Sequence, residues 1–142
     1  ISDDETVSCK PMAQEALILV TPAATVAPSW EQLIDLGFIN HPDGAHHAGM
    51  LLTANYEQFQ HINDFEKKGF SNQIGLILEP VSRGIGFTVL PAHAVAAYPK
   101  PELINSHHLP VAVSETLYLA VRRQQVLSNR MHTVINEVKK WL

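Results

Sequence analysis

The chain has 142 residues, of which 46% are hydrophobic and 17% are charged, and its formal net charge is −4. This size and composition predict one compact domain with a substantial core and exclude a disordered chain. The acidic balance argues against direct nucleic-acid binding, because phosphate backbones are bound by basic surfaces. No apolar run approaches the roughly 20 residues that a membrane-spanning helix requires.

Strand-like and helix-like stretches alternate along the chain, which predicts an α/β fold with a largely parallel sheet. Strands are predicted over residues 16–20, 38–40, 85–90, 109–113 and 117–121. Helices are predicted over residues 29–37, 46–60, 73–83 and 92–98, and from Ser128 to the end of the chain.

Several local signals set the predicted boundaries of two helices. Ser29 and Gln32 have the spacing of a capping box, and Gly37 supplies a left-handed stop. Asn72 is a good N-cap for the helix over residues 73–83, and Gly84 ends that helix. Residues 67–69 interrupt the preceding helical pattern, so no regular element is predicted there.

Two glycines one residue apart stand in the segment V-S-R-G-I-G-F-T-V-L-P-A-H-A-V, residues 81–95. A dinucleotide fingerprint needs a strand, a glycine turn and then a helix, with a third glycine. Here the helix comes before the glycines, and Val89 stands at the position of the third one. The order of the elements therefore disfavours a nucleotide-binding loop.

Signals for catalysis and metal binding are weak. Cys9 is the single cysteine, which excludes an intrachain disulfide and fits a reducing cytoplasm. The pairs His46-His47 and His107-His108 are adjacent and lack the i, i+4 spacing of a zinc-binding helix. There is no G-x-S-x-G nucleophile motif. We therefore expect no catalytic residues, no metal and no cofactor.

Four segments carry a family resemblance in the correct order. They are residues 11–22 (P-M-A-Q-E-A-L-I-L-V-T-P), 29–40 (S-W-E-Q-L-I-D-L-G-F-I-N), 81–95 and 117–138. The third segment is similar to the pattern "V-x-x-G-x-G-I-x-x-L-P", and the first is similar to a crossover strand "L-x-x-E-x-L-x-L-V-x-P". Together they resemble the effector-binding domain of LysR-type transcriptional regulators. Three features depart from the family pattern: Phe87 in place of isoleucine, the stretch 23–25 in place of "H-P-L", and Pro80 inside a helix.

The resemblance implies a periplasmic-binding-protein-like (type 2) fold, in which an effector binds between two α/β lobes. Residues 1–21 would be the crossover strand and a remnant of the first lobe, residues 22–112 a complete second lobe, and residues 113–142 the return strand and C-terminal helix of the first lobe. The family's first lobe begins upstream of the point that matches Ile1. We therefore expect an N-terminally truncated first lobe and weak or absent ligand binding by this chain.

Ligands of open α/β sheets lie beyond the carboxyl ends of strands and at helix N-termini. The resemblance places Asn72 where family members present a polar side chain to a small effector, and plain helix capping is the alternative explanation for this residue. The main candidate contacts are Asn72, Ser71 and Phe70, around a polar or anionic group such as a carboxylate or sulfate. Secondary candidates are Asn40, His41, Gly84, Ile85 and Gly86.

The function implied by the resemblance is that of a cytoplasmic, bacterial effector-sensing domain. Its partners would be a small-molecule effector and a second copy of the effector domain. DNA would be contacted only through a helix-turn-helix domain outside this chain. Two alternatives stay open: a stand-alone solute-binding protein of periplasmic type, and a small α/β enzyme.

Overall fold

The computed structural model describes residues 7–122, with side chains for residues 14–116. The chain divides into two compact units, one of Ile1–Glu15 with Ser114–Leu142 (unit 1) and one of Ala16–Val113 (unit 2). In the described part of unit 1, strand β6 (Ser114–Arg122) pairs with strand β1 (Val7–Pro22), which continues into unit 2. The helix predicted from Ser128 lies outside the described residues.

Unit 2 is built on five strands in the spatial order β3-β2-β4-β1-β5. The four further strands are β2 (Phe38–Asn40), β3 (Lys67–Phe70), β4 (Thr88–Pro91) and β5 (Ile104–His107). Strands β2 and β3 are parallel, and β1 is antiparallel to both β4 and β5. A parallel bridge between Phe38 and Phe87 joins the two groups, and the Ile39 amide donates to the Phe87 carbonyl at 2.8 Å.

The sheet is mixed: β2, β3, β4 and β5 run in the same direction, as a largely parallel sheet requires, but β1 runs against them. The reason lies in the path of β1, whose residue Leu17 pairs with Pro91 at the carboxyl end of β4. A strand that enters the sheet at the end where the parallel strands finish must run in the opposite direction. The apolar composition of residues 85–90 does indicate an interior strand, because β4 has neighbours on both sides.

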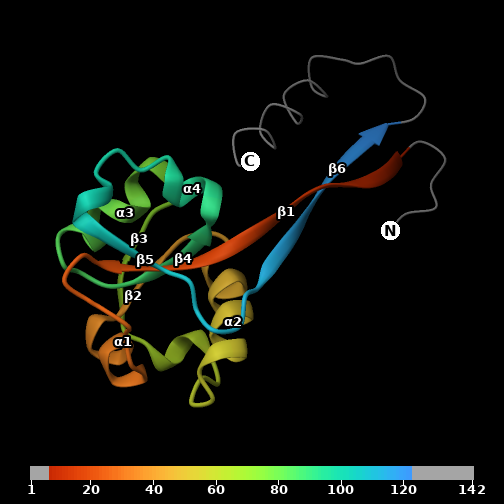
Figure 1. Ribbon diagram of the computed structural model, residues 1–142. Helices are drawn as coiled ribbons and strands as arrows, with labels where there is room; N and C mark the ends of the chain where they lie inside the picture. Colours follow the sequence, from red (N-terminus) through yellow and green to blue (C-terminus); the bar gives the residue numbers. More distant parts are fainter. Residues whose placement is uncertain (1–6, 123–142) are drawn as a thin grey trace. The chain divides into compact units, whose positions relative to one another are not determined.

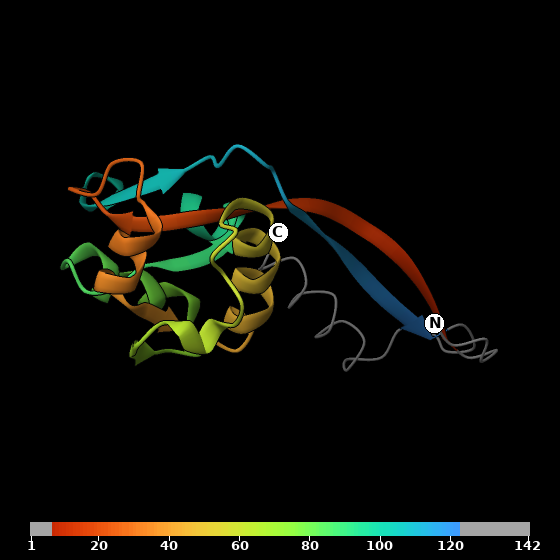
Figure 2. The same cartoon turned by 90° about the horizontal axis from the view of Figure 1, so that it is seen from below.

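Helices cover both faces of this sheet, as Figure 1 shows for unit 2. Helices α1 (Trp30–Leu36) and α2 (Gly44–Asn55) lie on one face, and α3 (Ile74–Ser82) and α4 (Ala92–Ala96) lie on the other. Figure 2 looks at unit 2 from the side of α1 and α2. Two short 3-10 helices, η1 (Ile62–Asp64) and η2 (Pro101–Leu103), stand in the connections.

The core has two halves because β1 supplies side chains to both faces of the sheet. Leu17 and Leu19 pack in the half beneath α1 and α2, whereas Ile18 and Val20 pack in the half beneath α3 and α4. All four side chains are buried. This period-two alternation explains why the A-L-I-L-V stretch is apolar at every position.

Helix α1 begins with the capping box that the sequence predicts. The Gln32 amide donates to Ser29 Oγ at 3.2 Å, and the Ser29 amide donates to Gln32 Oε1 at 2.8 Å. Gly37 ends the helix with a φ of 78°. These bonds satisfy amides that would otherwise have no partner within the helix.

Replacing Ser29 with alanine is expected to lower the free energy of unfolding by about 1 kcal/mol, because the first turn of α1 loses its side-chain acceptor. Urea denaturation followed by circular dichroism measures this change. The matched control is Ser106→Ala on the exposed side of β5, which should leave the midpoint almost unchanged. Equal effects of the two substitutions would contradict the capping role.

Three segments have a secondary structure that differs from the sequence prediction. Residues 67–69 belong to strand β3, and β5 was missed because only Ile104 of its four residues is buried. Residues 109–113 form no strand. Instead, the side chain of Asn55 bonds both backbone groups of Val111, donating to its carbonyl at 2.9 Å and accepting from its amide at 2.8 Å. A side chain thus takes the place of a neighbouring strand.

Candidate functional site

The parallel strands of unit 2 end together at one edge of the sheet. Asn40 at the end of β2 pairs with Phe70 at the end of β3, and the Ser71 amide donates to the Asn40 carbonyl at 3.1 Å. The chain also enters and leaves unit 2 at this edge, where the Leu17 amide donates to the Val113 carbonyl at 2.9 Å. We call Asn40 and residues 70–72 the carboxyl edge.

The structure brings the three main candidate residues next to Asn40. Phe70 is 62% exposed, and Asn72 is also exposed, so both side chains can be reached from solvent. Ser71 is half-buried, and its hydroxyl bonds locally, accepting from the Gln73 amide at 3.1 Å. The carboxyl edge therefore combines an apolar ring, an amide and a partly covered hydroxyl.

Asn72 is not the N-cap of α3, and this prediction was wrong. The cap residue is Gln73, and the helix starts at Ile74. The physical reason is the bond from the Gln73 amide to Ser71 Oγ, which forms a tight local turn just before the helix. Asn72 lies inside that turn, and its side chain is not needed for capping.

Asn40 presents a hydrogen-bond donor whose orientation is fixed. Its side-chain oxygen accepts from the His41 amide at 2.9 Å. A backbone amide can only donate, so the accepting atom is Oδ1 and the NH₂ group is the other end of the side chain. A Cβ on Gly44 would overlap Asn40 Oδ1, so the absence of a side chain there makes room for this arrangement. Sequence analysis missed Gly44, whose only signal is its place at the end of the H-P-D-G turn.

The ring of His41 is not available at the surface. It is 3% exposed, and its Nε2 atom donates to the Val89 carbonyl at 2.9 Å. Burial lowers the pKa of His41 below its ordinary value; the bond to Val89 opposes this shift, and the neighbouring His47 adds to it. His41 is thus a supporting residue behind Asn40.

Two helices start at the carboxyl edge without a side-chain cap. Helix α2 begins after Asp43 and α3 begins after Gln73, and neither residue forms a side-chain cap bond. The first amides of an α-helix have no partner inside the helix and carry a partial positive charge. This arrangement favours a negatively charged or strongly accepting group at the edge.

Gly84, Ile85 and Gly86 lie at the other end of the strands. Gly86 precedes β4, and the next residue donates its amide to the carbonyl of Gly37, which precedes β2. Gly84 and Gly86 have φ values of 85° and 80°. Gly84 and Ile85 line a separate hollow of about 340 Å³ together with charged Asp35 and Lys68. The structure of unit 2 therefore does not bring the glycine segment together with Asn72.

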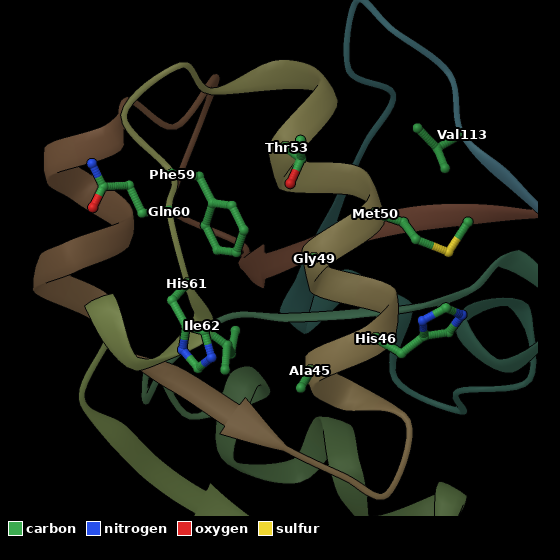
Figure 3. Close-up of a pocket in the computed structure, with 10 residues that line it drawn as sticks. All are labelled: Ala45, His46, Gly49, Met50, Thr53, Phe59, Gln60, His61, Ile62 and Val113. Carbon is green, nitrogen blue, oxygen red and sulfur yellow. The ribbon is translucent and has the colours of Figure 1, made fainter.

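A further hollow of about 660 Å³ runs along the outer side of α2. Figure 3 shows Phe59, Gln60, His61 and Ile62 on one side of this helix and His46, Met50 and Val113 on the other. None of the predicted effector contacts lines it. Most of its lining is apolar, and its polar side chains are His46, Thr53, Gln60 and His61.

The described residues also bear on two other features, metal sites and membrane-spanning helices. No group of three or more His, Cys, Asp or Glu residues is arranged to hold a metal ion within that part of the chain. No helix there is both long and apolar enough to cross a membrane.

Solved structures with a similar fold include regulatory and effector-binding domains. Full-length OxyR C199D from Pseudomonas aeruginosa matches with a TM-score of 0.61 and 19% identity, over 96% of this chain and 51% of that one. The reduced OxyR regulatory domain from the same organism matches with a TM-score of 0.60 and 15% identity, over 99% and 69%. The effector-binding domain of QuiR in complex with shikimate matches with a TM-score of 0.55 and 11% identity, over 99% and 68%.

At these identities the likenesses concern the fold alone. The chain spans about half the length of the first two structures. No curated protein sequence matches it. The family model of the LysR substrate binding domain matches residues 1–142. The chain therefore belongs to the LysR substrate-binding domain family, whose role is effector sensing, and the predicted family and fold class are confirmed.

Proposed function

We propose that the carboxyl edge of unit 2 forms one wall of an effector site for a small anionic or polar molecule. Asn40 and Asn72 would donate side-chain hydrogen bonds, Ser71 would add a polar contact, and Phe70 would pack against an apolar part of the effector. In this proposal the segment of Gly84, Ile85 and Gly86 shapes the sheet and does not touch the effector.

One observation carries this proposal. The side-chain amide of Asn40 accepts a hydrogen bond from the His41 backbone amide at 2.9 Å. It lies at the same edge as two helix starts that lack side-chain caps. Each of these features favours an acceptor or an anion, and the 62% exposure of Phe70 gives such a ligand an apolar neighbour. A helix start alone would attract any anion. The Asn40 side-chain NH₂ group, whose orientation is fixed, also favours a particular position for the acceptor atom of the ligand.

The wider role follows from family membership. We propose that residues 22–112 act as the second lobe, and that residues 1–21 and 113–142 belong to the first. Effector binding would shift an equilibrium between two states that bind the effector with different affinity. That shift would be relayed, in a homo-oligomer in the cytoplasm, to DNA-binding domains outside this chain. The edge would bind its ligand without catalysing a reaction.

Titration of the ¹⁵N-labelled chain with sodium acetate, sodium sulfate and shikimate tests the proposed site. The backbone amides of residues 71–76 and the side-chain amide of Asn40 should shift with at least one of these probes, even at millimolar affinity. Replacing Asn40 with aspartate should weaken that binding by about tenfold or more, because a carboxylate repels the anion where an amide attracted it.

Asn63→Asp in η1 is the matched control for this substitution. It adds the same charge to unit 2 away from the carboxyl edge and leaves Oδ1 as an acceptor for Lys67, 3.2 Å away. The control should bind the probes as the unmodified chain does. Shifts centred on Gly84 and Gly86 instead of residues 71–76 would contradict the proposed wall.

A further inference from the structure

His41 and His47 form a buried pair of imidazoles directly behind the carboxyl edge. They are 3% and 4% exposed, and their ring centroids lie 5.8 Å apart. His41 follows the last residue of β2, and His47 stands in the first turns of α2. A third ring, that of His46, lies 5.8 Å from His47. Buried histidine pairs are unusual in a core that is otherwise apolar.

The pair lies where three elements meet. The His41 Nε2 atom donates to the Val89 carbonyl of β4, and the His41 carbonyl accepts from the Gly44 amide at the start of α2. The His41 backbone amide donates a hydrogen bond to Asn40 Oδ1. One residue therefore connects the end of β2, the middle of β4, the first turn of α2 and the side chain of Asn40.

The surroundings of His41 favour a neutral ring. The titratable and charged groups that face it are His47 from α2 and Asp43 from the turn, and β4 presents only the Val89 carbonyl. Because a carbonyl can only accept, Nε2 carries the proton in the neutral form. A second proton would place a positive charge in the core, beside another imidazole and near the positive end of α2. Asp43 opposes this repulsion from an exposed position.

We propose that His41 is an acid-sensitive latch on the carboxyl edge. As a neutral imidazole it ties the end of β2 and the first turn of α2 to β4. When it takes up a proton, the ring moves towards solvent, the tie is released, and the side chain of Asn40 loses its fixed orientation. The latch depends on packing within unit 2 and operates whether or not an effector binds.

The direction of the pH dependence follows from the lowered pKa. In the unfolded chain His41 titrates near the ordinary histidine value of 6.5, and in the folded chain it titrates below that. The contribution of the neutral ring to stability is therefore complete above about pH 6.5 and is lost as the pH falls towards the folded-state pKa. The ratio of folded to unfolded chain falls by about tenfold for each pKa unit between the two states.

Imidazole ¹H–¹⁵N spectra of the chain, recorded from about pH 8 down to about pH 5, test the latch directly. His41 should keep the signals of a neutral Nε2–H ring at about pH 6.5, where a free imidazole is half protonated. At lower pH its signals should change together with those of the Asn40 side-chain amide. A His41 ring that is half charged at or above that pH, or Asn40 signals that stay constant while His41 titrates, would overturn the proposal.

A second measurement uses His41→Gln, since a glutamine amide can donate to the Val89 carbonyl and cannot take up a proton. Urea denaturation at about pH 7.5 and about pH 5.5 should show a smaller loss of stability on acidification in this variant than in the unmodified chain. His108→Gln, on an exposed loop, is the control and should keep the full loss. His107, whose pKa burial also lowers, is expected to contribute to the loss that remains. An equal loss in all three proteins would contradict the latch, and the spectra decide the question if His41→Gln does not fold.

Discussion

Replacing Gly86 with alanine is expected to lower the free energy of unfolding of unit 2 by about 2–4 kcal/mol. Gly86 has a φ of 80°, and a Cβ there would lie 2.9 Å from Ile39 Cγ1 and 3.2 Å from the Gly37 carbonyl oxygen. The substitution therefore combines backbone strain with a steric clash at the point where β2 and β4 meet. Urea denaturation followed by circular dichroism measures the change.

Two other glycines separate these causes. Gly84 has a φ of 85° and open space around its Cβ position, so Gly84→Ala should cost only the backbone strain of about 1–2 kcal/mol. Gly75 in α3 has open space and no positive φ, so Gly75→Ala should raise stability by up to about 1 kcal/mol. A Gly86→Ala variant no less stable than Gly84→Ala would show that the clash is relieved by movement of Ile39.

Replacing Phe87 with alanine is expected to lower the free energy of unfolding by about 3–5 kcal/mol, because it empties a large volume in the core. Phe87 is fully buried, and its ring centroid lies 4.9 Å from that of Phe65 and 5.3 Å from that of Phe38. Isoleucine, the family residue at this position, keeps part of the volume and should cost less than alanine. Denaturation in urea ranks the three proteins.

The control for Phe87 is the same substitution at an exposed ring. Phe70 is 62% exposed, so Phe70→Ala should change the free energy of unfolding by no more than about 0.5 kcal/mol. If Phe70→Ala lowered the free energy of unfolding as much as Phe87→Ala, the Phe70 ring would have to be buried, which contradicts its exposed position in unit 2.

Elements with strong local signals could be predicted from the sequence. The Ser29–Gln32 capping box and the apolar core residues of β1 both depend on a residue spacing that can be read directly from the amino-acid sequence. Strand β5 and the segment 109–113 could not be predicted, because their structure depends on partners far away in the chain. The bonds between Asn55 and Val111 join residues 56 positions apart, and nothing local to either residue indicates them.

The candidate site was predicted in part. Its place at the end of a predicted strand selected Asn40, whereas the family resemblance and a predicted helix start selected Asn72 with its neighbours Phe70 and Ser71. The structure places Asn40 and residues 70–72 side by side. Gly84, Ile85 and Gly86 were selected for their exposed backbone, and they lie at the opposite end of the strands. In this structure the two glycines serve the backbone: each has a positive φ, and the missing side chain of Gly86 allows β2 and β4 to approach.

The narrow junction between β2 and β4 determines how the carboxyl edge is connected to the rest of the sheet. Asn40 and Phe70 stand on the β2–β3 pair, whereas β1, the strand shared with unit 1, belongs to the neighbouring group. Within the sheet, the β2–β3 pair is connected to β1 only through β4. The connecting contacts are the Phe38–Phe87 bridge, the bond from Thr88 to Ile39 and the bond from His41 to Val89. Within the sheet itself few hydrogen bonds cross this junction, and helix α2 packs against both β2 and β4 there.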